Sequence, residues 1–309
     1  MPNYKPEGAL LTTSENQAFL KSQKSLADAM QRETVLEARA AVCDSSHNLI
    51  VPLGPMKGLI PREECALGIP DGTTRDIAII SRVGKPVCFV VTGFGEDEQG
   101  QPVAMLSRRR VQEKCFAQLM ETLRPGDVIP AKVTHLENFG CFVDIGCGIV
   151  SLIPIDVISV SRISHPRDRF ALGQDIFAVV KSVEGGRIYL SHKELLGTWE
   201  ENAALFAPGE TVAGAVRSVE DYGVFVELTP NLAGLAEPHP GVRPGQQASV
   251  FIKSLIPEKM KVKLIIVDAF DSPAAPAPLR YFLPGSHIDE FLYSPPQCTK
   301  VIKTRFSAT

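Results

Sequence analysis

The chain contains an internal repeat, and this repeat restricts its fold more than any other feature. The segment GDVIPAKVTHLENFGCFVDIGCGIVSLIP, which starts at Gly126, matches GETVAGAVRSVEDYGVFVELTPNLAGLAEP, which starts at Gly209. Each copy continues into β-branched strands around a polar turn, over Leu172–Ser191 in one case and Arg243–Ile266 in the other. A repeat of this kind predicts a supersecondary unit that occurs at least twice.

A third and fainter copy lies upstream, in Ala38–Glu64 and Val83–Ser107. Each copy shows about five short strands, with hairpin signals in GEDEQGQ, VEGGR and PEKM. A unit this small gains stability when its sheet closes, because closure removes the exposed edges. The sequence therefore predicts a mainly β fold with linker helices, made of three tandem five-stranded OB-fold barrels, the first of them degenerate.

Helical patterns and composition place the expected boundaries between these modules. Thr12 with Glu15 and Ser191 with Glu194 match the capping-box pattern of a helix start. We expect an N-terminal helix with the degenerate module (12–110), a linker helix (111–124), an OB-fold domain (125–193), a second linker helix (194–208), a second OB-fold domain (209–268), and a Pro-rich linker with an aromatic tail (269–309).

Composition excludes several classes of protein. The net charge is −3, whereas proteins that bind duplex DNA through phosphates alone are usually strongly basic, so nucleic-acid binding here needs more than bulk charge. The seven cysteines include no C-x-x-C pair and lie mostly in apolar runs, as reduced thiols of a cytoplasmic protein do. No apolar run approaches the ~20 residues that cross a bilayer, and the N-terminus has no apolar signal core. We expect a cytoplasmic protein without membrane association.

Strand parity separates the two faces of the strand in the middle copy, because successive side chains point to opposite faces. Cys141, Val143 and Ile145 share one face, and Phe142 and Asp144 share the other. The purely apolar set must face the barrel interior. Phe142 is therefore predicted on the solvent side, next to a carboxylate.

The last copy repeats this pattern, with Phe225 and Glu227 on the face opposite the apolar set Val224, Val226 and Leu228. Phe139 and Tyr222 each precede a glycine, which permits a bend that brings them to the same outer face. The alternative is that linker helices or a neighbouring repeat cover these aromatic side chains.

Outward aromatic rings beside cations form a surface on which the bases of single-stranded nucleic acid stack, at roughly 1–3 kcal/mol per base. The predicted RNA-binding residues are Phe139, Phe142, Lys132, Lys181 and Arg187 in the middle copy, and Tyr222, Phe225, Arg217, Lys253 and Lys261 in the last copy.

The first copy lacks this set of residues. Its two aromatic positions become His47 and Ile50, and the position of Arg187 becomes Val103, while the interior pattern is kept. We expect the first module to bind protein or to serve as a spacer.

Residues 126–193 and 209–268 resemble the S-one domain, the OB-fold RNA-binding module of the bacterial ribosomal protein S-one family. FGCFVDIG is similar to the family's F-G-A-F-V-D-L, and GRIYLS is similar to its R-I-S-L-S. The stretch RSVEDYGVFVELTPNLAGLAE resembles short homologues from Gram-positive bacteria, and the whole resemblance covers roughly residues 15–268.

This resemblance implies single-stranded RNA binding in the cytoplasm, with messenger RNA and the small ribosomal subunit as partners. The family's RNA-facing aromatics fall on Phe139, Phe142, Tyr222 and Phe225, and its strand-five arginine falls on Arg187 and Lys261. The family's histidine after G-L-V is replaced by Pro154 and by Glu237. The alternative function is a protein-docking adaptor or RNA-metabolism regulator, on the ribosome or on an RNA-degrading complex, without a direct role in translation initiation.

The sequence contains none of the common catalytic motifs. The sequence has no P-loop, no G-x-G-x-x-G that opens a helix and no G-x-S-x-G elbow, and its six histidines are not at metal-ligand spacing. Asp144 and Glu227 are expected as outward acids without evident partners. The sequence predicts no catalytic residue, no metal site, no cofactor and no small-molecule substrate.

Overall fold

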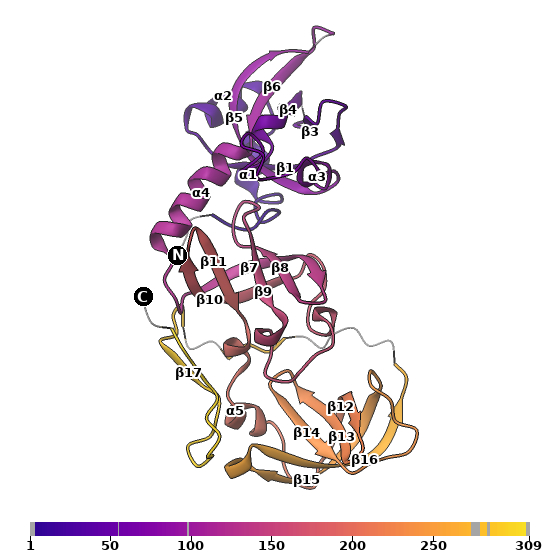
Figure 1. Ribbon diagram of the computed structural model, residues 1–309. Coiled ribbons are helices and arrows are strands. Elements are labelled where there is room, and N and C mark those ends of the chain that lie inside the picture. Colours follow the sequence, from indigo (N-terminus) through magenta and orange to yellow (C-terminus); the bar gives the residue numbers. More distant parts are fainter. Residues whose placement is uncertain (1–3, 55, 98, 273–278, 283–284, 307–309) are drawn as a thin grey trace. The chain divides into compact units, whose positions relative to one another are not determined.

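The computed structural model describes residues 4–54, 56–97, 99–272, 279–282 and 285–306 (Figure 1). The chain divides into two compact units, Met1–Leu123 with Asp144–Val150, and Arg124–Val143 with Ser151–Thr309. One six-stranded sheet and two closed five-stranded barrels follow each other along the sequence, which confirms the predicted fold class. Residues 273–278, most of the expected Pro-rich linker, lie outside the described residues.

The first unit contains the six-stranded sheet, which we call the first module. Its strand order is β1-β5-β6-β4-β3-β2, so this sheet is open, whereas a five-stranded barrel was expected. The end strands β1 and β2 are two halves of one interrupted strand, separated by Ala40 and Ala41. Apart from that break, the sheet keeps the order of a barrel. The strands are β1 Leu36–Arg39, β2 Val42–Cys43, β3 Leu49–Pro52, β4 Lys57–Ile60, β5 Pro86–Glu96 and β6 Pro102–Ser107.

Short helices accompany this sheet: α1 Ser14–Phe19, α2 Gln23–Gln31, η1 Arg62–Glu64, α3 Ile77–Ile80 and α4 Arg109–Thr122. The first helix begins one residue later than the Thr12 capping pattern predicts, because the hydroxyl of Thr13 accepts the hydrogen bond from the Asn16 N–H. α4 lies where the first linker helix was expected.

The free edge of β1 is closed by a side chain. Asn16, which is buried, donates from its amide nitrogen to the Glu37 carbonyl oxygen at 2.9 Å and accepts from the Glu37 N–H at 2.8 Å. The Asn16 amide thus takes the place of a neighbouring strand, and it satisfies backbone groups that an open edge leaves unpaired.

The middle barrel closes in the order β10-β11-β9-β8-β7, with β7 paired to β10. Its elements are β7 Val128–Glu137, β8 Gly140–Asp144, β9 Val150–Pro154, η2 Ile155–Val157, η3 Pro166–Asp168, β10 Asp175–Glu184 and β11 Arg187–Ser191. Cys141 and Val143 of β8 are fully buried, as strand parity predicts, and Ile145 just after this strand is also buried.

The last barrel closes in the order β12-β13-β14-β16-β15. Its elements are β12 Thr211–Glu220, β13 Gly223–Thr229, β14 Leu232–Ala236, β15 Gln247–Ile256, η5 Pro257–Lys259 and β16 Lys261–Phe270. Val224 and Val226 are fully buried, in agreement with the parity argument.

Two short helices join these barrels, η4 Lys193–Leu196 and α5 Trp199–Ala203. The expected capping box at Ser191 does not begin the helix that carries Trp199. Instead Gly197 separates the two helices, and Thr198 with Glu201 forms the capping box of α5.

The C-terminal segment is part of the second unit's core. It forms a hairpin of β17 Glu290–Leu292 and β18 Lys303–Arg305. Phe291 and Tyr293 are buried in the same hydrophobic cluster as the interior of the last barrel and Trp199. The backbone N–H of Trp199 donates to the Tyr293 carbonyl oxygen at 3.0 Å, which fixes the hairpin beside α5 (Figure 1).

Candidate nucleic-acid interface

Each closed barrel carries a pair of aromatic rings on its outer surface, on either side of a glycine. Phe139, in the turn before β8, is 56% exposed, and its ring centroid lies 5.9 Å from that of half-buried Phe142, at an interplanar angle of 89°. Tyr222 is 66% exposed and lies 6.2 Å from the ring of Phe225, at 88°. The described parts of the chain leave ring surface open to solvent in both pairs.

The glycine within each pair lets the strands approach closely. A Cβ atom on Gly140 would lie 2.5 Å from the carbonyl oxygen of Ile153, and one on Gly223 would lie 2.4 Å from that of Ala236. Such distances are far inside van der Waals contact, so only glycine fits. The two aromatic rings therefore lie on either side of a residue whose identity is fixed by strand packing.

Four of the predicted cations are exposed on the barrels. Lys181 and Lys253 lie at β-bulges, in β10 and in β15 respectively, and both point to solvent. Arg187 and Lys261 are exposed first residues of β11 and β16. Lys132 differs, because its ammonium lies 2.7 Å from the carboxylate of the exposed Asp175.

Arg217 lies in an ion-pair network between the two barrels of the second unit. Its guanidinium donates to both carboxylate oxygens of Glu227, at 2.9 and 3.0 Å, and lies 3.6 Å from Asp168. Glu227 also accepts from Arg169 of the middle barrel, which is 3% exposed. The expectation that Glu227 is an outward acid without partners is therefore wrong, because the middle barrel covers that position. We leave Arg217 out of the proposed surface.

Asp144 is likewise not an outward acid. It is 2% exposed, and its carboxylate accepts hydrogen bonds from the backbone N–H groups of Glu7, Gly146 and Gly148 at 2.7 to 3.0 Å. Burial and, to a smaller extent, the charge of Glu7 raise the pKa of Asp144 to about 6. This carboxylate orders the loop after β8 and the N-terminal segment of the first unit.

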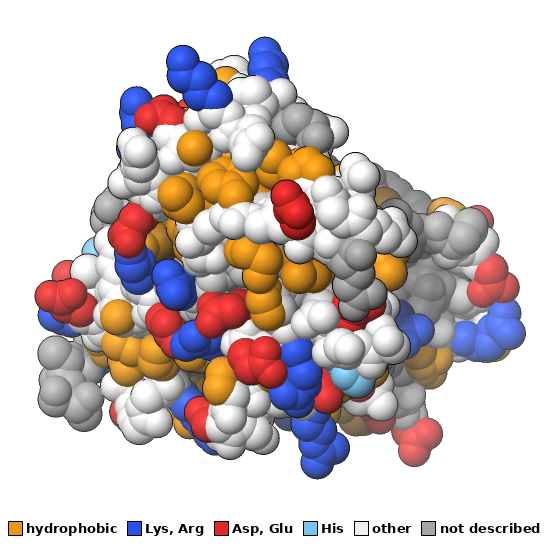
Figure 2. Space-filling model, turned by 90° about the horizontal axis from the view of Figure 1, so that it is seen from above, with side chains coloured by type: hydrophobic (Ala, Val, Ile, Leu, Met, Phe, Trp, Pro, Cys, Tyr) orange, Lys and Arg blue, Asp and Glu red, His pale blue; other side chains and the backbone are white. Residues whose placement is uncertain are grey.

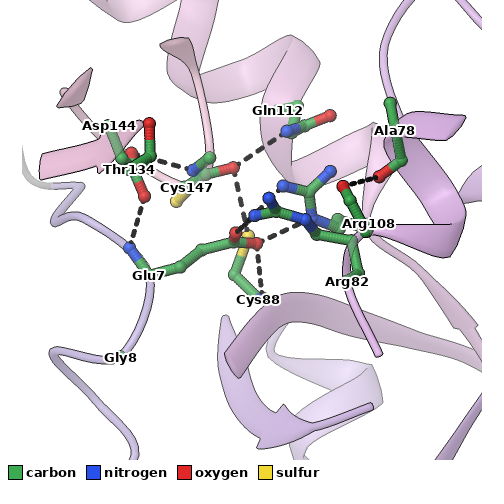
Figure 3. Close-up of polar contacts among 12 residues, drawn as sticks. Glu7, Gly8, Ala78, Arg82, Cys88, Arg108, Gln112, Thr134, Asp144 and Cys147 are labelled. Atoms are coloured by element: carbon green, nitrogen blue, oxygen red, sulfur yellow. Dashed lines mark hydrogen bonds and ion pairs between the residues drawn. The ribbon is translucent and has the colours of Figure 1, made fainter. Parts of the chain in front are cut away.

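The first unit also holds a buried ion pair that strand patterns do not reveal (Figure 3). Glu7 receives two hydrogen bonds from Arg108, at 2.7 and 3.0 Å, and one from the Cys88 N–H at 3.1 Å. Burial acts to raise the pKa of Glu7, but Arg108 outweighs it and holds that pKa below its usual range. The Arg82 guanidinium lies 3.4 Å away. The Glu7 carboxylate thus has its cationic partners within the first unit, so the cluster is structural.

Two further exposed aromatic side chains of the middle barrel were not predicted. The imidazole of exposed His135 lies 6.4 Å from the Phe142 ring. Tyr189 is 41% exposed on β11, two residues after Arg187 and on the same face. Strand parity in GRIYLS was sufficient to find Tyr189.

Among the described residues no group of three His, Cys, Asp or Glu side chains is placed to hold a metal ion. All seven cysteines are free thiols. No described helix has the length and apolar character that a bilayer crossing requires.

Comparison with known proteins identifies the family. Residues 122–193 match the S1 RNA binding domain. The chain is 31% identical over 264 residues to small ribosomal subunit protein bS1 of Staphylococcus haemolyticus, covering 80% of this chain and 64% of that protein. It is 30% identical over 277 residues to bS1 of Staphylococcus aureus strain COL, covering 84% and 68%.

The chain thus spans about two thirds of the length of these relatives. A solved multidomain protein with nucleic acid binding domains from Streptococcus pneumoniae aligns over 76% of this chain and 73% of its own, with 15% identity and a TM-score of 0.25. The sequence relatives are ribosomal proteins, in agreement with the prediction that this chain is not an enzyme. On the identity and coverage of these relatives, the chain belongs to the family of bacterial small ribosomal subunit protein bS1.

Proposed function

We propose that this protein binds single-stranded RNA, including messenger RNA, in association with the small ribosomal subunit in the cytoplasm. The observation that carries the proposal is the repeated pair of surface rings, in which an exposed ring (Phe139 or Tyr222) lies beside a half-buried one (Phe142 or Phe225). Aromatic rings on an OB fold give unpaired bases a stacking surface. The family and the matching domain description support the same ligand.

Charge has a secondary role in this proposal. Lys181, Arg187, Lys253 and Lys261 are exposed and can neutralise phosphates. The chain nevertheless has a net charge of −3, and the face in Figure 2 shows basic side chains interspersed with acidic ones. Stacking must therefore supply much of the binding free energy, and affinity should fall only modestly as salt rises.

The test is binding of fluorescent polyuridine to the full chain and to the double variant Phe142→Ala with Phe225→Ala. Loss of two stacked bases predicts a fall in affinity of about 30-fold or more. The matched control is Leu172→Ala with Val267→Ala, which removes two side chains that are 66% and 59% exposed elsewhere on the barrels. Equal binding by both double variants would overturn the stacking mechanism.

The second candidate is a protein-docking adaptor, and one observation favours it. The first module carries Val42, Ile50 and Leu59 as neighbours in register, and Ile50 stands where the last barrel carries Phe225. An adaptor does not need the aromatic pairs. Wild-type protein that fails to bind polyuridine at all would favour the adaptor over RNA binding.

A further inference from the structure

One row of outward side chains crosses every module from strand to strand, and we call it the outer row. In the last barrel the row is Ser218, Phe225, Leu235 and Lys263, each opposite the next in the printed register of β12, β13, β14 and β16. Neighbours opposite each other on one face are in contact range, so these side chains form one surface.

The middle barrel has the same row with a different last member. Leu152 of β9 lies opposite Tyr189 of β11, as Leu235 lies opposite Lys263. Gly140 packs against Leu152 as Gly223 packs against Leu235, which sets Phe142 and Phe225 at equivalent places. The row in the middle barrel therefore runs from Phe142 through Leu152 to Tyr189.

The first module again keeps the row and changes its chemistry. Ile50 lies opposite Leu59, and Leu59 lies opposite Met105. The positions of the ring and of the last member are both aliphatic here. The three modules thus present one geometry with three different ends: Met105, Tyr189 and Lys263.

We propose that Tyr189 and Lys263 are RNA-contacting residues that give the two barrels different tasks. This inference rests on the proposed RNA-binding function. Tyr189, which is 41% exposed, adds a third ring to the Phe139 and Phe142 pair, so the middle barrel stacks an additional base. Lys263 is exposed beside Leu235 and close to Lys261, so the last barrel contacts a phosphate at the equivalent point.

The distance between Phe142 and Tyr189 supports stacking of a separate base on each ring. Two inter-strand steps, each ~4.8 Å, separate Phe142 on β8 from Tyr189 on β11, with Leu152 between them. The Tyr189 ring therefore meets a different base from the one on Phe142. At this point of the outer row the middle barrel therefore adds stacking, and the last barrel adds a salt-dependent contact.

The first experiment measures polyuridine affinity of full-length Tyr189→Ala and Tyr189→Phe. We expect the alanine variant to bind about tenfold more weakly, with an unchanged slope of log affinity against log salt, because stacking releases no counterions. The phenylalanine variant keeps the ring and should bind like wild type. Met105→Ala, at the same point of the row in the first module, is the matched control and should leave affinity unchanged.

The second experiment measures the salt dependence of Lys263→Gln and Lys263→Arg. Removal of one phosphate contact should reduce the magnitude of the salt slope by about 0.7, while the arginine variant keeps it. Lys300→Gln removes an exposed lysine of the C-terminal segment and should keep the wild-type slope.

The outcomes separate this inference from the proposed function. If wild type does not bind polyuridine, the proposed function fails and the inference fails with it. If wild type binds and Phe142→Ala weakens it while Tyr189→Ala does not, only the assignment of Tyr189 is overturned. An unchanged salt slope in Lys263→Gln overturns the assignment of Lys263. Fluorescence of the single tryptophan, Trp199, checks that each middle-barrel and last-barrel variant is folded.

Discussion

A buried histidine fixes the C-terminal segment on the middle barrel. His192 is fully buried, and its Nδ1 lies 2.8 Å from the Ile158 carbonyl oxygen, which can only accept, so Nδ1 carries the proton. Its Nε2 then accepts from the hydroxyl of Tyr281 at 3.2 Å, and that hydroxyl accepts from the Phe177 N–H. Burial lowers the pKa of His192 to about 4. The neutral imidazole is therefore the form that the fold requires.

This histidine predicts a loss of stability in mild acid. Its pKa is 6.5 in the reference state and about 4 in the fold, so between these values the unfolded chain holds more protons. The contribution of His192 to stability is full above pH 6.5 and falls by about 3 kcal/mol as the pH approaches 4. Urea unfolding followed by Trp199 fluorescence at pH 7, 6, 5 and 4.5 measures this fall. His192→Gln should be less stable at pH 7 but should flatten the pH dependence, and an equally steep dependence in the variant contradicts the assignment.

At the scale of elements, strand pairing depends on two glycines that let strands approach closely and on one asparagine side chain that pairs with a strand edge. Gly140 and Gly223 permit the close approach beneath the aromatic pairs. Asn16 closes the edge of β1 with two hydrogen bonds to Glu37. Both devices act on the backbone, so substitutions there change the position or pairing of a whole strand.

Substitution Gly223→Ala should force β13 and β14 apart. We expect it to lower both the stability of the protein and its affinity for polyuridine. The added Cβ would meet the Ala236 carbonyl oxygen at 2.4 Å, and overpacking of this kind typically costs about 1–3 kcal/mol. Gly95→Ala on β5 is the control, because a Cβ there meets no atom within 4 Å. Urea unfolding gives the stability change. Equal effects of the two substitutions would show that the close approach of β13 and β14 does not require glycine at position 223.

Substitution Asn16→Ala should leave the N–H and carbonyl of Glu37 unpaired in a buried place, at a cost of about 1–3 kcal/mol. Faster hydrogen exchange of the peptide that contains Leu36–Arg39 is the expected readout, with Gln17→Ala on the exposed side of the same helix as the control. Unchanged exchange in Asn16→Ala would mean that the edge is closed by other groups.

At the scale of the second unit, two barrels and a hairpin meet at shared polar groups. Asn231 is fully buried; its side chain accepts from the Val160 N–H and donates to the carbonyl oxygens of Lys193 and Gly197. Tyr293 of the hairpin donates to the Asn231 carbonyl oxygen. With the Arg169, Glu227 and Arg217 network, these contacts connect the middle barrel to the last one without a free linker.

Glu227→Gln tests this junction. It leaves Arg169, which is 3% exposed, without its carboxylate, and breaking a buried ion pair typically costs about 3–5 kcal/mol. The control Asp271→Asn breaks the pair with Arg243, whose side chains are 73% and 70% exposed, and should cost less than about 1 kcal/mol. Thermal unfolding followed by Trp199 fluorescence compares the two variants. Equal shifts of the unfolding midpoint would contradict the claim that Glu227 stabilises the contact between the two barrels.

The same residues show how much of the structure could be predicted from the sequence. Repeat and parity together predicted the barrels, the buried Val143 and Val226, and rings that are open to solvent, because these depend on alternation along one strand. Parity failed for Asp144 and Glu227, since the outer face of one strand is covered by other segments whose positions no local pattern encodes. Glu7 was missed for the same reason: its partner Arg108 is 101 residues away.

By itself, the sequence determined which side chains face inward in each repeat and where the glycines and aromatic rings recur, since these follow from the two-residue period of a strand. The tertiary structure alone decided which outward charged side chains remain available to contact RNA. Arg217 and Glu227 are neutralised across a junction of two barrels, whereas Lys263 and Tyr189 come beside Leu235 and Leu152 only through parallel pairing of strands far apart in the chain. Long-range pairing depends on how the whole sheet closes, and closure is a property of the folded chain rather than of any one segment.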